Sequence, residues 1–174
     1  SDGLWNNYNV QDVATPEGWV RNPELVQEFY NARRAELAGV IPNAAHIAIA
    51  GLEKDYDVTV ITQNIDNLHE RAGSTRIVHL HGELTKVRPE KGHYEYNYAE
   101  DEVLDVRYDP VFMGDKAPNG EQLRPHIVWF GEAVPNIDKA ITVVESADIM
   151  LIVGTSLQVY PAAGLYRYAP VACP

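Results

Sequence analysis

The chain has 174 residues, of which 45% are hydrophobic, and this is enough to form the core of one domain. Its formal net charge of -11 argues against non-specific binding to nucleic-acid phosphates, which needs a basic surface. No apolar run approaches the roughly 20 residues of a membrane span. The single cysteine, Cys173, excludes an intrachain disulfide and is typical of a reducing compartment. We therefore expect a cytoplasmic protein with neither nucleic acid nor a membrane as partner.

The N-terminal part of the sequence predicts an irregular segment followed by two helices. Residues 1–21 are rich in Asn, Asp and aromatic residues without periodicity, so we expect a surface segment or lid. A helix is predicted from Asn22-Pro23 to about Leu37, because Asn is a good N-cap and proline suits the first helical position. A second helix, beginning near Pro42-Asn43, is apolar nearly all round, which predicts that it is buried against a sheet.

Four apolar runs in the remaining sequence predict the strands of a buried parallel sheet, at 58–62, 76–80, 126–130 and 148–153. Further helices are predicted at 67–72, where Gly73 would end the helix, at 136–147 and at 161–169. Polar residues or glycine directly follow each predicted strand. Because ligands of such sheets bind beyond the carboxyl ends of the strands, the four ends predict one shared crevice.

Residues 85–123 interrupt this pattern. They lack periodicity and contain several tyrosines, an acidic cluster and a loop rich in Gly, Pro and Asn, with a candidate strand at 103–108. We therefore expect a small module inserted into an α/β domain.

Four segments, in order and spacing, resemble the sirtuin family: 62–69 (TQNIDNLH), 81–84 (HGEL), 127–132 (IVWFGE) and 154–163 (GTSLQVYPAA). Sirtuins are NAD-dependent protein lysine deacylases. The opening 2–5 (DGLW) and the helical 29–34 (FYNARR) are most similar to the bacterial and mitochondrial class III branch. The resemblance covers most of the chain. It implies a single partial catalytic domain with a Rossmann-like parallel sheet and flanking helices at about 40–84 and 124–174, and the inserted module at about 85–123.

The resemblance also implies a reaction. The acyl-lysine oxygen attacks the nicotinamide ribose of NAD, nicotinamide leaves, and the acyl group ends on ADP-ribose. His81 would be the general base, since an imidazole can accept a ribose hydroxyl proton near neutral pH, and Gly82 would leave room for the substrate.

NAD is thus the expected co-substrate, and two segments would bind it. The nicotinamide and ribose side of the pocket would be formed by Gln63, Asn64, Ile65 and Asp66, whose amides and carboxylate suit a carboxamide and hydroxyls. The ribose and phosphate region would meet a strand-to-helix turn whose N–H groups and hydroxyls favour anions, formed by Gly154, Thr155 and Ser156.

The acylated lysine of a protein substrate is the second expected partner. By the resemblance, its peptide backbone would pair with the segment that contains Val128, Phe130, Gly131 and Glu132. Tyr30 and Arg33 lie at i and i+3 of the first helix and would together hold the carboxylate of a succinyl or malonyl group. We therefore expect desuccinylation and demalonylation with some deacetylation.

Two features depart from the family pattern. Many sirtuins bind zinc in the small module through two pairs of cysteines, whereas 85–123 contains no cysteine, so no zinc is expected. The glycine-rich segment that cradles the NAD diphosphate and the last strand of the family are expected to lie outside this sequence. We therefore expect this polypeptide by itself to be inactive or to bind NAD weakly.

Two alternative functions stay open. A non-catalytic module would bind ADP-ribose or an acyl peptide without releasing nicotinamide. A metal-dependent hydrolase would use His79, His81 and Glu83, since the two histidines share one face of a strand. Isolated residues of these types are usually structural, and we interpret His69 and His79 in that way.

Overall fold

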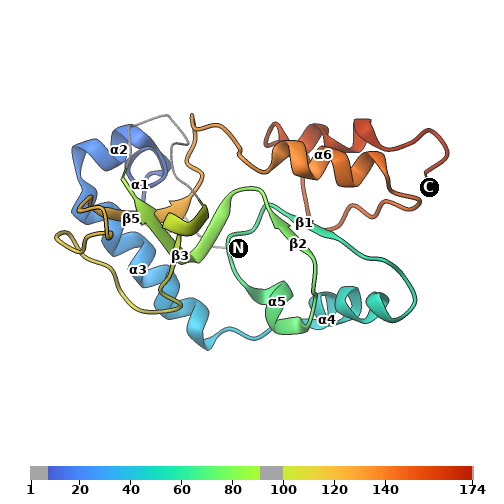
Figure 1. The fold of residues 1–174 in the computed structure, drawn as a ribbon, viewed down its shortest axis with the longest axis horizontal. Coiled ribbons are helices and arrows are strands. Elements are labelled where there is room, and N and C mark those ends of the chain that lie inside the picture. The colour runs from blue at the N-terminus through green and yellow to red at the C-terminus, as the bar shows by residue number, and fades with distance from the viewer. Residues whose placement is uncertain (1–7, 91–99, 174) are drawn as a thin grey trace.

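The computed structural model describes residues 8–90 and 100–173, which form two small sheets with helices around them (Figure 1). Helices α1 to α3 lie beside an antiparallel sheet at one end of the molecule, and α4 to α6 lie around a parallel strand pair at the other. In chain order the elements are α1 (Val10–Val13), α2 (Pro16–Arg21), α3 (Pro23–Gly39), α4 (Ala44–Gly51), η1 (Leu52–Lys54), β1 (Val60–Thr62), α5 (Leu68–Ala72), β2 (Ile77–His79), β3 (Gly82–Pro89), η2 (Glu100–Glu102), β4 (Leu104–Asp105), β5 (Leu123–Ile127), α6 (Ile137–Glu145) and η3 (Ala162–Tyr168).

The first two predicted strands are confirmed as a parallel pair. β1 and β2 align with Ile61 opposite Val78, and the N–H of Leu80 continues the pairing by donating to the Thr62 carbonyl at 3.0 Å. Between them, α5 ends at Gly73, whose φ of 105° is the left-handed conformation that glycine adopts most easily. The carboxyl ends of β1 and β2 therefore lie side by side.

The other two predicted strands of the parallel sheet are wrong. Of the third run, only His126 and Ile127 lie in a strand, at the end of β5, and β5 pairs antiparallel with β3 and not with the parallel pair. The run 148–153 forms no strand, and Leu151 and Val153 are 68% and 63% exposed. An apolar run becomes a strand only where another strand accepts its hydrogen bonds, and no strand of the described chain pairs with this one.

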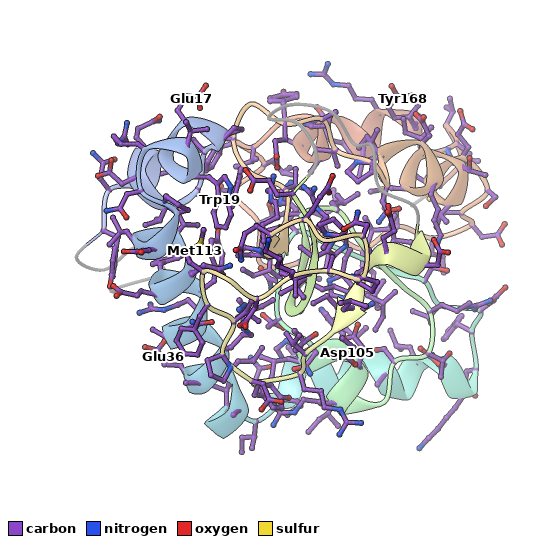
Figure 2. The ribbon with its side chains drawn as sticks, turned by 60° about the vertical axis from the view of Figure 1, so that its left-hand side comes forward. Glu17, Trp19, Glu36, Asp105, Met113 and Tyr168 are labelled. Atoms are coloured by element: carbon purple, nitrogen blue, oxygen red, sulfur yellow. The ribbon has the colours of Figure 1, made fainter. Side chains whose placement is uncertain are left out.

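The expectation of an irregular lid at the N-terminus is also wrong for residues 8–21; residues 1–7 lie outside the described part. Helix α2 begins after Thr15, whose side-chain oxygen accepts a hydrogen bond from Gly18 N–H at 2.9 Å. Trp19 on this helix points inward and is buried, whereas Glu17 points to solvent (Figure 2). This region belongs to the main core, together with Val13 and Phe29.

The two predicted helices that follow have different outcomes. Helix α3 begins after Asn22, as predicted, and contributes Phe29 and Tyr30 to the main core. Helix α4 also begins where expected, after an Asn43 capping box, but none of its residues is buried and Ile47 is 58% exposed. It packs against α5 and not against a sheet, so the prediction of a buried helix, which rested on apolar composition alone, is wrong.

The central segment is joined closely to the rest of the fold. β3 (Gly82–Pro89) crosses residue 85, the predicted start of the inserted module, without a break. β4 is shorter than the candidate strand at 103–108. A small core contains Val87, Val111, Ala117 and Leu123. The tyrosines at 94, 96 and 98 and His93 lie outside the described residues.

The predicted helices near the C-terminus are present. α6 packs its buried Ala140 and Val144 against Val78 and Leu80, and η3 is a 3₁₀ helix within the predicted range 161–169. No single helix of the described chain is both long and apolar enough to cross a membrane; only α3 taken together with 44–54, a pair bent by 72°, passes on length and composition.

Candidate active site

His81 lies just beyond the end of β2, next to the loop that follows β1. Its Nδ1 is 3.2 Å from the Gln63 carbonyl oxygen. A carbonyl only accepts hydrogen bonds, so Nδ1 carries the proton in this contact and Nε2 keeps a free electron pair in the neutral ring. Burial lowers the pKa of His81 below its usual value, and the hydrogen bond to Gln63 offsets part of the shift. The ring is therefore neutral at pH 7 and can accept a proton.

Gly82 is required by the backbone around it. Its φ is +83°, and a Cβ atom at this position would lie 2.0 Å from the carbonyl oxygen of His126. The adjacent His81 carbonyl accepts a hydrogen bond from Val128 N–H at 3.0 Å. The glycine thus permits the close approach of the two chain segments, which is a different reason from the substrate access inferred from the sequence.

Two segments predicted to bind the cofactor meet in the structure. The side-chain amide of Gln63 donates to Thr155 Oγ1 at 3.2 Å, although the residues are 92 positions apart. Thr155 lies in an exposed turn between Gly154, with a φ of 67°, and Ser156. The exposed hydroxyls of this turn and the neutral amide of Gln63 are chemically suited to a dinucleotide, because they hydrogen-bond to hydroxyls and phosphates without adding charge.

The rest of the loop after β1 is held by its own hydrogen bonds. Asn64 N–H donates to Thr62 Oγ1 at 3.0 Å, and the Ile65 carbonyl accepts from Leu84 N–H at 2.7 Å. Asp66 accepts from Leu68 N–H at 3.0 Å and so supports the start of α5. The four loop residues therefore form an ordered edge beside His81.

The predicted peptide-binding segment already uses several of its backbone donors. Val128 N–H donates to His81, and Phe130 N–H donates to the Ala14 carbonyl at 2.9 Å. The Phe130 side chain is 51% exposed, and Gly131 is exposed as well. Pairing with a substrate backbone stays a prediction, and it has to use groups other than these N–H donors.

Glu132 has a structural role that its sequence position did not reveal. Its side chain is only 4% exposed, and its carboxylate accepts from Arg124 at 2.7 Å and from Trp129 N–H at 2.7 Å. The Arg124 guanidinium also lies 3.4 Å from the centre of the Trp129 ring. The carboxylate is therefore committed to a buried ion pair, and any contact of Glu132 with a peptide would come from its backbone.

Tyr30 and Arg33 occupy neighbouring positions on α3 with different environments. Tyr30 is 1% exposed, its hydroxyl accepts from Trp129 Nε1 at 3.1 Å, and burial raises its pKa well above the usual range. Arg33 is partly buried, pairs with Glu36 at 3.3 Å and lies 5.3 Å from the Phe29 ring centre. The neutral phenol and the charged guanidinium are both present, and their joint binding of an acyl carboxylate stays a prediction.

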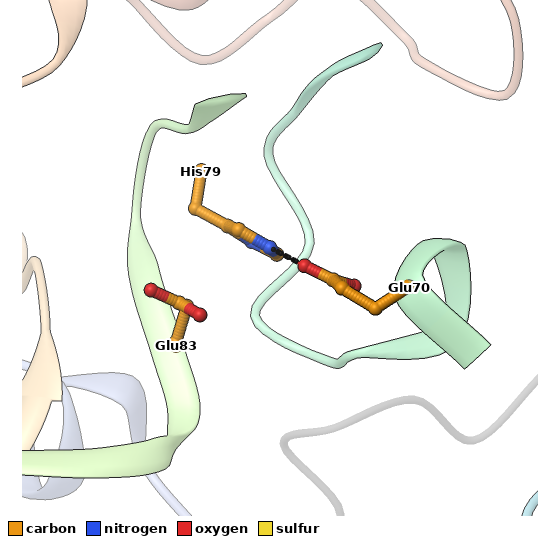
Figure 3. A group of neighbouring side chains, drawn as sticks. All are labelled: Glu70, His79 and Glu83. Carbon is orange, nitrogen blue, oxygen red and sulfur yellow. Dashed lines mark hydrogen bonds and ion pairs between the residues drawn. The ribbon is translucent and has the colours of Figure 1, made fainter. Parts of the chain in front are cut away.

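The proposed metal ligands do not assemble around His81. Glu70, His79 and Glu83 offer ligand atoms within 4.8 Å of one another (Figure 3), whereas His81 does not belong to this group. His79 Nε2 already contacts Glu70 at 2.7 Å, and its Nδ1 faces the Asn64 carbonyl at 3.3 Å. The structure therefore groups His79 and Glu83 with Glu70 and not with His81, which differs from the ligand set that the metal-hydrolase interpretation requires.

Comparison with known proteins gives consistent results. A model of the Sir2 family matches residues 1–161. The NAD-dependent protein deacylase of Bacteroides thetaiotaomicron is 61% identical over 168 residues, covering 97% of this chain and 71% of that protein. The enzyme of the same name from Helicobacter pylori strain 26695 is 53% identical over 170 residues, covering 97% of this chain and 70% of that protein.

Solved structures show the same relationship. A Sir2 homologue in complex with NAD matches with a TM-score of 0.83 and 38% identity, covering 97% of this chain and 64% of that chain. An ADP-ribose complex of a Sir2 homologue variant matches with a TM-score of 0.85 and 38% identity, covering 97% of this chain and 66% of that chain. This chain thus spans slightly less than two thirds of these two solved proteins. The predicted α/β fold class is confirmed, and the chain belongs to the Sir2 family.

Proposed function

We propose that the protein of this chain is an NAD-dependent protein lysine deacylase, which moves the acyl group of an acyl-lysine to ADP-ribose and releases nicotinamide. The observation that carries this proposal is the position of His81. A neutral, half-buried imidazole lies at a strand end beside the loop 63–66, in a chain 61% identical to a protein named NAD-dependent protein deacylase.

The residues around His81 supply the parts that this chemistry needs. NAD, when bound, provides the ribose carbon that the acyl oxygen attacks. The hydrogen bond from His81 Nδ1 to Gln63 fixes the ring so that Nε2 can take a proton from a ribose hydroxyl. Amide groups of Gln63 and Asn64 orient the nicotinamide carboxamide without introducing charge, and the turn at Thr155 meets the ribose and phosphate region.

The substrate is an acylated lysine in a protein segment. One structural neighbour, 30% identical with a TM-score of 0.74 and covering 94% of this chain and 69% of that chain, is a Sir2 protein bound to a propionylated peptide. We extend this to acidic acyl groups, because Arg33 lies one helical turn from the neutral hydroxyl of Tyr30. A guanidinium and a phenol together can bind the carboxylate of a succinyl or malonyl group.

The test is deacylation of matched succinyl-lysine and acetyl-lysine peptides by the full-length protein, with and without NAD, followed by peptide mass. Deacylation that requires NAD and is lost in His81→Ala, while NAD binding persists, is the expected result. NAD binding without any nicotinamide release would indicate a binding module. Turnover that needs a metal ion but no NAD would indicate a hydrolase.

A further inference from the structure

His79 lies at the end of β2 with both ring nitrogens facing hydrogen-bond acceptors. Nε2 is 2.7 Å from a carboxylate oxygen of Glu70 on α5, and Nδ1 is 3.3 Å from the carbonyl oxygen of Asn64 in the loop after β1. Figure 3 shows the ring directed at Glu70 from the strand, with Glu83 nearby. The side chain is only 7% exposed, so solvent does not replace these partners readily.

This arrangement determines the protonation state that fits the site. A carboxylate and a carbonyl can accept hydrogen bonds but cannot donate them, and a neutral imidazole has one N–H group. The neutral ring would therefore leave one lone pair facing an oxygen. Only the imidazolium, with an N–H on each nitrogen, forms both hydrogen bonds.

The charged groups around His79 agree with this geometry. Burial by itself lowers the pKa of His79, but the hydrogen bond and charge of Glu70, the charge of Glu83 and the contact with Asn64 outweigh it, so the pKa lies above its usual value. Two further histidines interact electrostatically with His79: His69 on α5 and His126 on β5 both have lowered pKa values, chiefly because of burial. These rings are neutral at pH 7 and leave the positive charge on His79.

His79 and His81 hold consecutive carbonyl groups of one loop. His81 Nδ1 contacts the Gln63 carbonyl, and His79 Nδ1 contacts the Asn64 carbonyl. The backbone of His79 is fixed in turn, because its own carbonyl accepts from the Asn136 side chain at 2.8 Å. The loop expected to contact NAD is thus anchored by two rings on one strand end, one neutral and one charged.

We propose that His79, as an imidazolium that bridges the Glu70 carboxylate and the Asn64 carbonyl, is a positioning residue that holds the 63–66 loop in its NAD-binding conformation. The NAD part of this inference rests on the proposed function. His79 touches no reacting atom; it acts through Asn64 and the loop. Its loss of a proton on the alkaline side removes one of the two hydrogen bonds and so weakens the link from Glu70 through His79 to Asn64, while His81 stays neutral and able to act as base.

The experiment combines histidine NMR titration with NAD binding by calorimetry and with steady-state kinetics on the full-length protein. In the intact protein His79 should titrate above pH 6.5 and His81 below it, 6.5 being the usual histidine value. Glu70→Gln should lower the midpoint of His79 and leave that of His81 nearly unchanged. The same variant should raise Kd and KM for NAD by about threefold to tenfold, the range of one hydrogen bond, with a smaller change in kcat.

The matched control is Glu145→Gln, which removes an exposed carboxylate on α6 and should change neither titration nor NAD affinity. In the intact protein, NAD affinity should weaken as the pH rises through the midpoint of His79, and in Glu70→Gln this weakening should move to lower pH.

Two results would overturn the inference: a His79 midpoint at or below 6.5, or a Glu70→Gln variant whose NAD affinity equals that of Glu145→Gln. NAD binding with the expected pH dependence but without turnover would refute the proposed function alone. Absence of NAD binding would overturn both.

Discussion

Replacing Glu132 by glutamine tests whether this residue acts in folding or in substrate binding. The sequence assigns it to the peptide-binding segment, but the structure buries its carboxylate against Arg124, with Arg88 at 3.8 Å. The side chains of all three residues are 3% or 4% exposed. Glu132→Gln keeps the shape of the side chain and one acceptor oxygen, which can serve Trp129 N–H, but it removes the charge that compensates the two guanidinium groups and replaces the oxygen that accepts from Arg124 Nη1 with an NH2 group that cannot accept.

The expected cost follows from the burial of the pair. Removing one partner of a buried ion pair costs about 3–5 kcal/mol because it leaves an uncompensated charge. Since glutamine still accepts hydrogen bonds, we expect the lower end, about 3 kcal/mol. For a domain of this size each kcal/mol lowers Tm by about 2–4 °C, which gives a decrease of about 6–12 °C.

The assay is urea unfolding and thermal unfolding of the parent, Glu132→Gln and the surface control Glu145→Gln. The control should unfold like the parent. A Glu132→Gln variant that is as stable as the control but has lost peptide affinity would refute this role, since Glu132 would then serve the substrate and not the core.

Three further predictions concern other parts of the site. Gly82→Ala should prevent folding of the β2–β3 region, because its Cβ would lie 2.0 Å from the His126 carbonyl oxygen, whereas Gly39→Ala, with open space around its Cβ, should fold normally; circular dichroism distinguishes the two. Burial and the nearby cations, Arg88 first among them, lower the pKa of His126 to about 3, so its contribution to stability is present above pH 6.5 and falls by about 1.4 kcal/mol per pH unit below it. In urea unfolding at pH 7 and pH 5, the free energy of unfolding of His126→Gln should therefore change less with pH than that of the parent. An equal change in the two proteins would contradict this cause. Tyr30→Phe combined with Arg33→Met should reduce desuccinylation far more than deacetylation, and equal loss of both would argue against a role in selectivity.

Local signals in the sequence predicted the parts of the fold that depend on near neighbours. The start of α3 at Asn22-Pro23 and the end of α5 at Gly73 follow from capping and backbone conformation, which a few residues determine. The pairing of β1 with β2 follows from two apolar runs joined by one short helix. The same reasoning placed His81 beside the loop 63–66, because polar residues that follow adjacent parallel strands share one edge.

Features that depend on distant partners were missed. The mixed sequence of helix α2 predicts a lid, yet Trp19 is fixed by a hydrogen bond from Nε1 to Glu90 at 2.8 Å, across 71 positions. The run 148–153 has the composition of a strand but no pairing neighbour in the described chain. An arginine beside an apolar run, such as Arg124, is the one local hint that Glu132 is needed as its partner.

The most direct test of the account is the stoichiometry of products from NAD and an acyl-lysine peptide, measured by mass spectrometry on the full-length protein and on His81→Ala. We predict equal amounts of nicotinamide, O-acyl-ADP-ribose and free lysine peptide from the full-length protein, and neither O-acyl-ADP-ribose nor free lysine peptide from His81→Ala. Free acid in place of O-acyl-ADP-ribose, or unchanged product formation by His81→Ala, would contradict it.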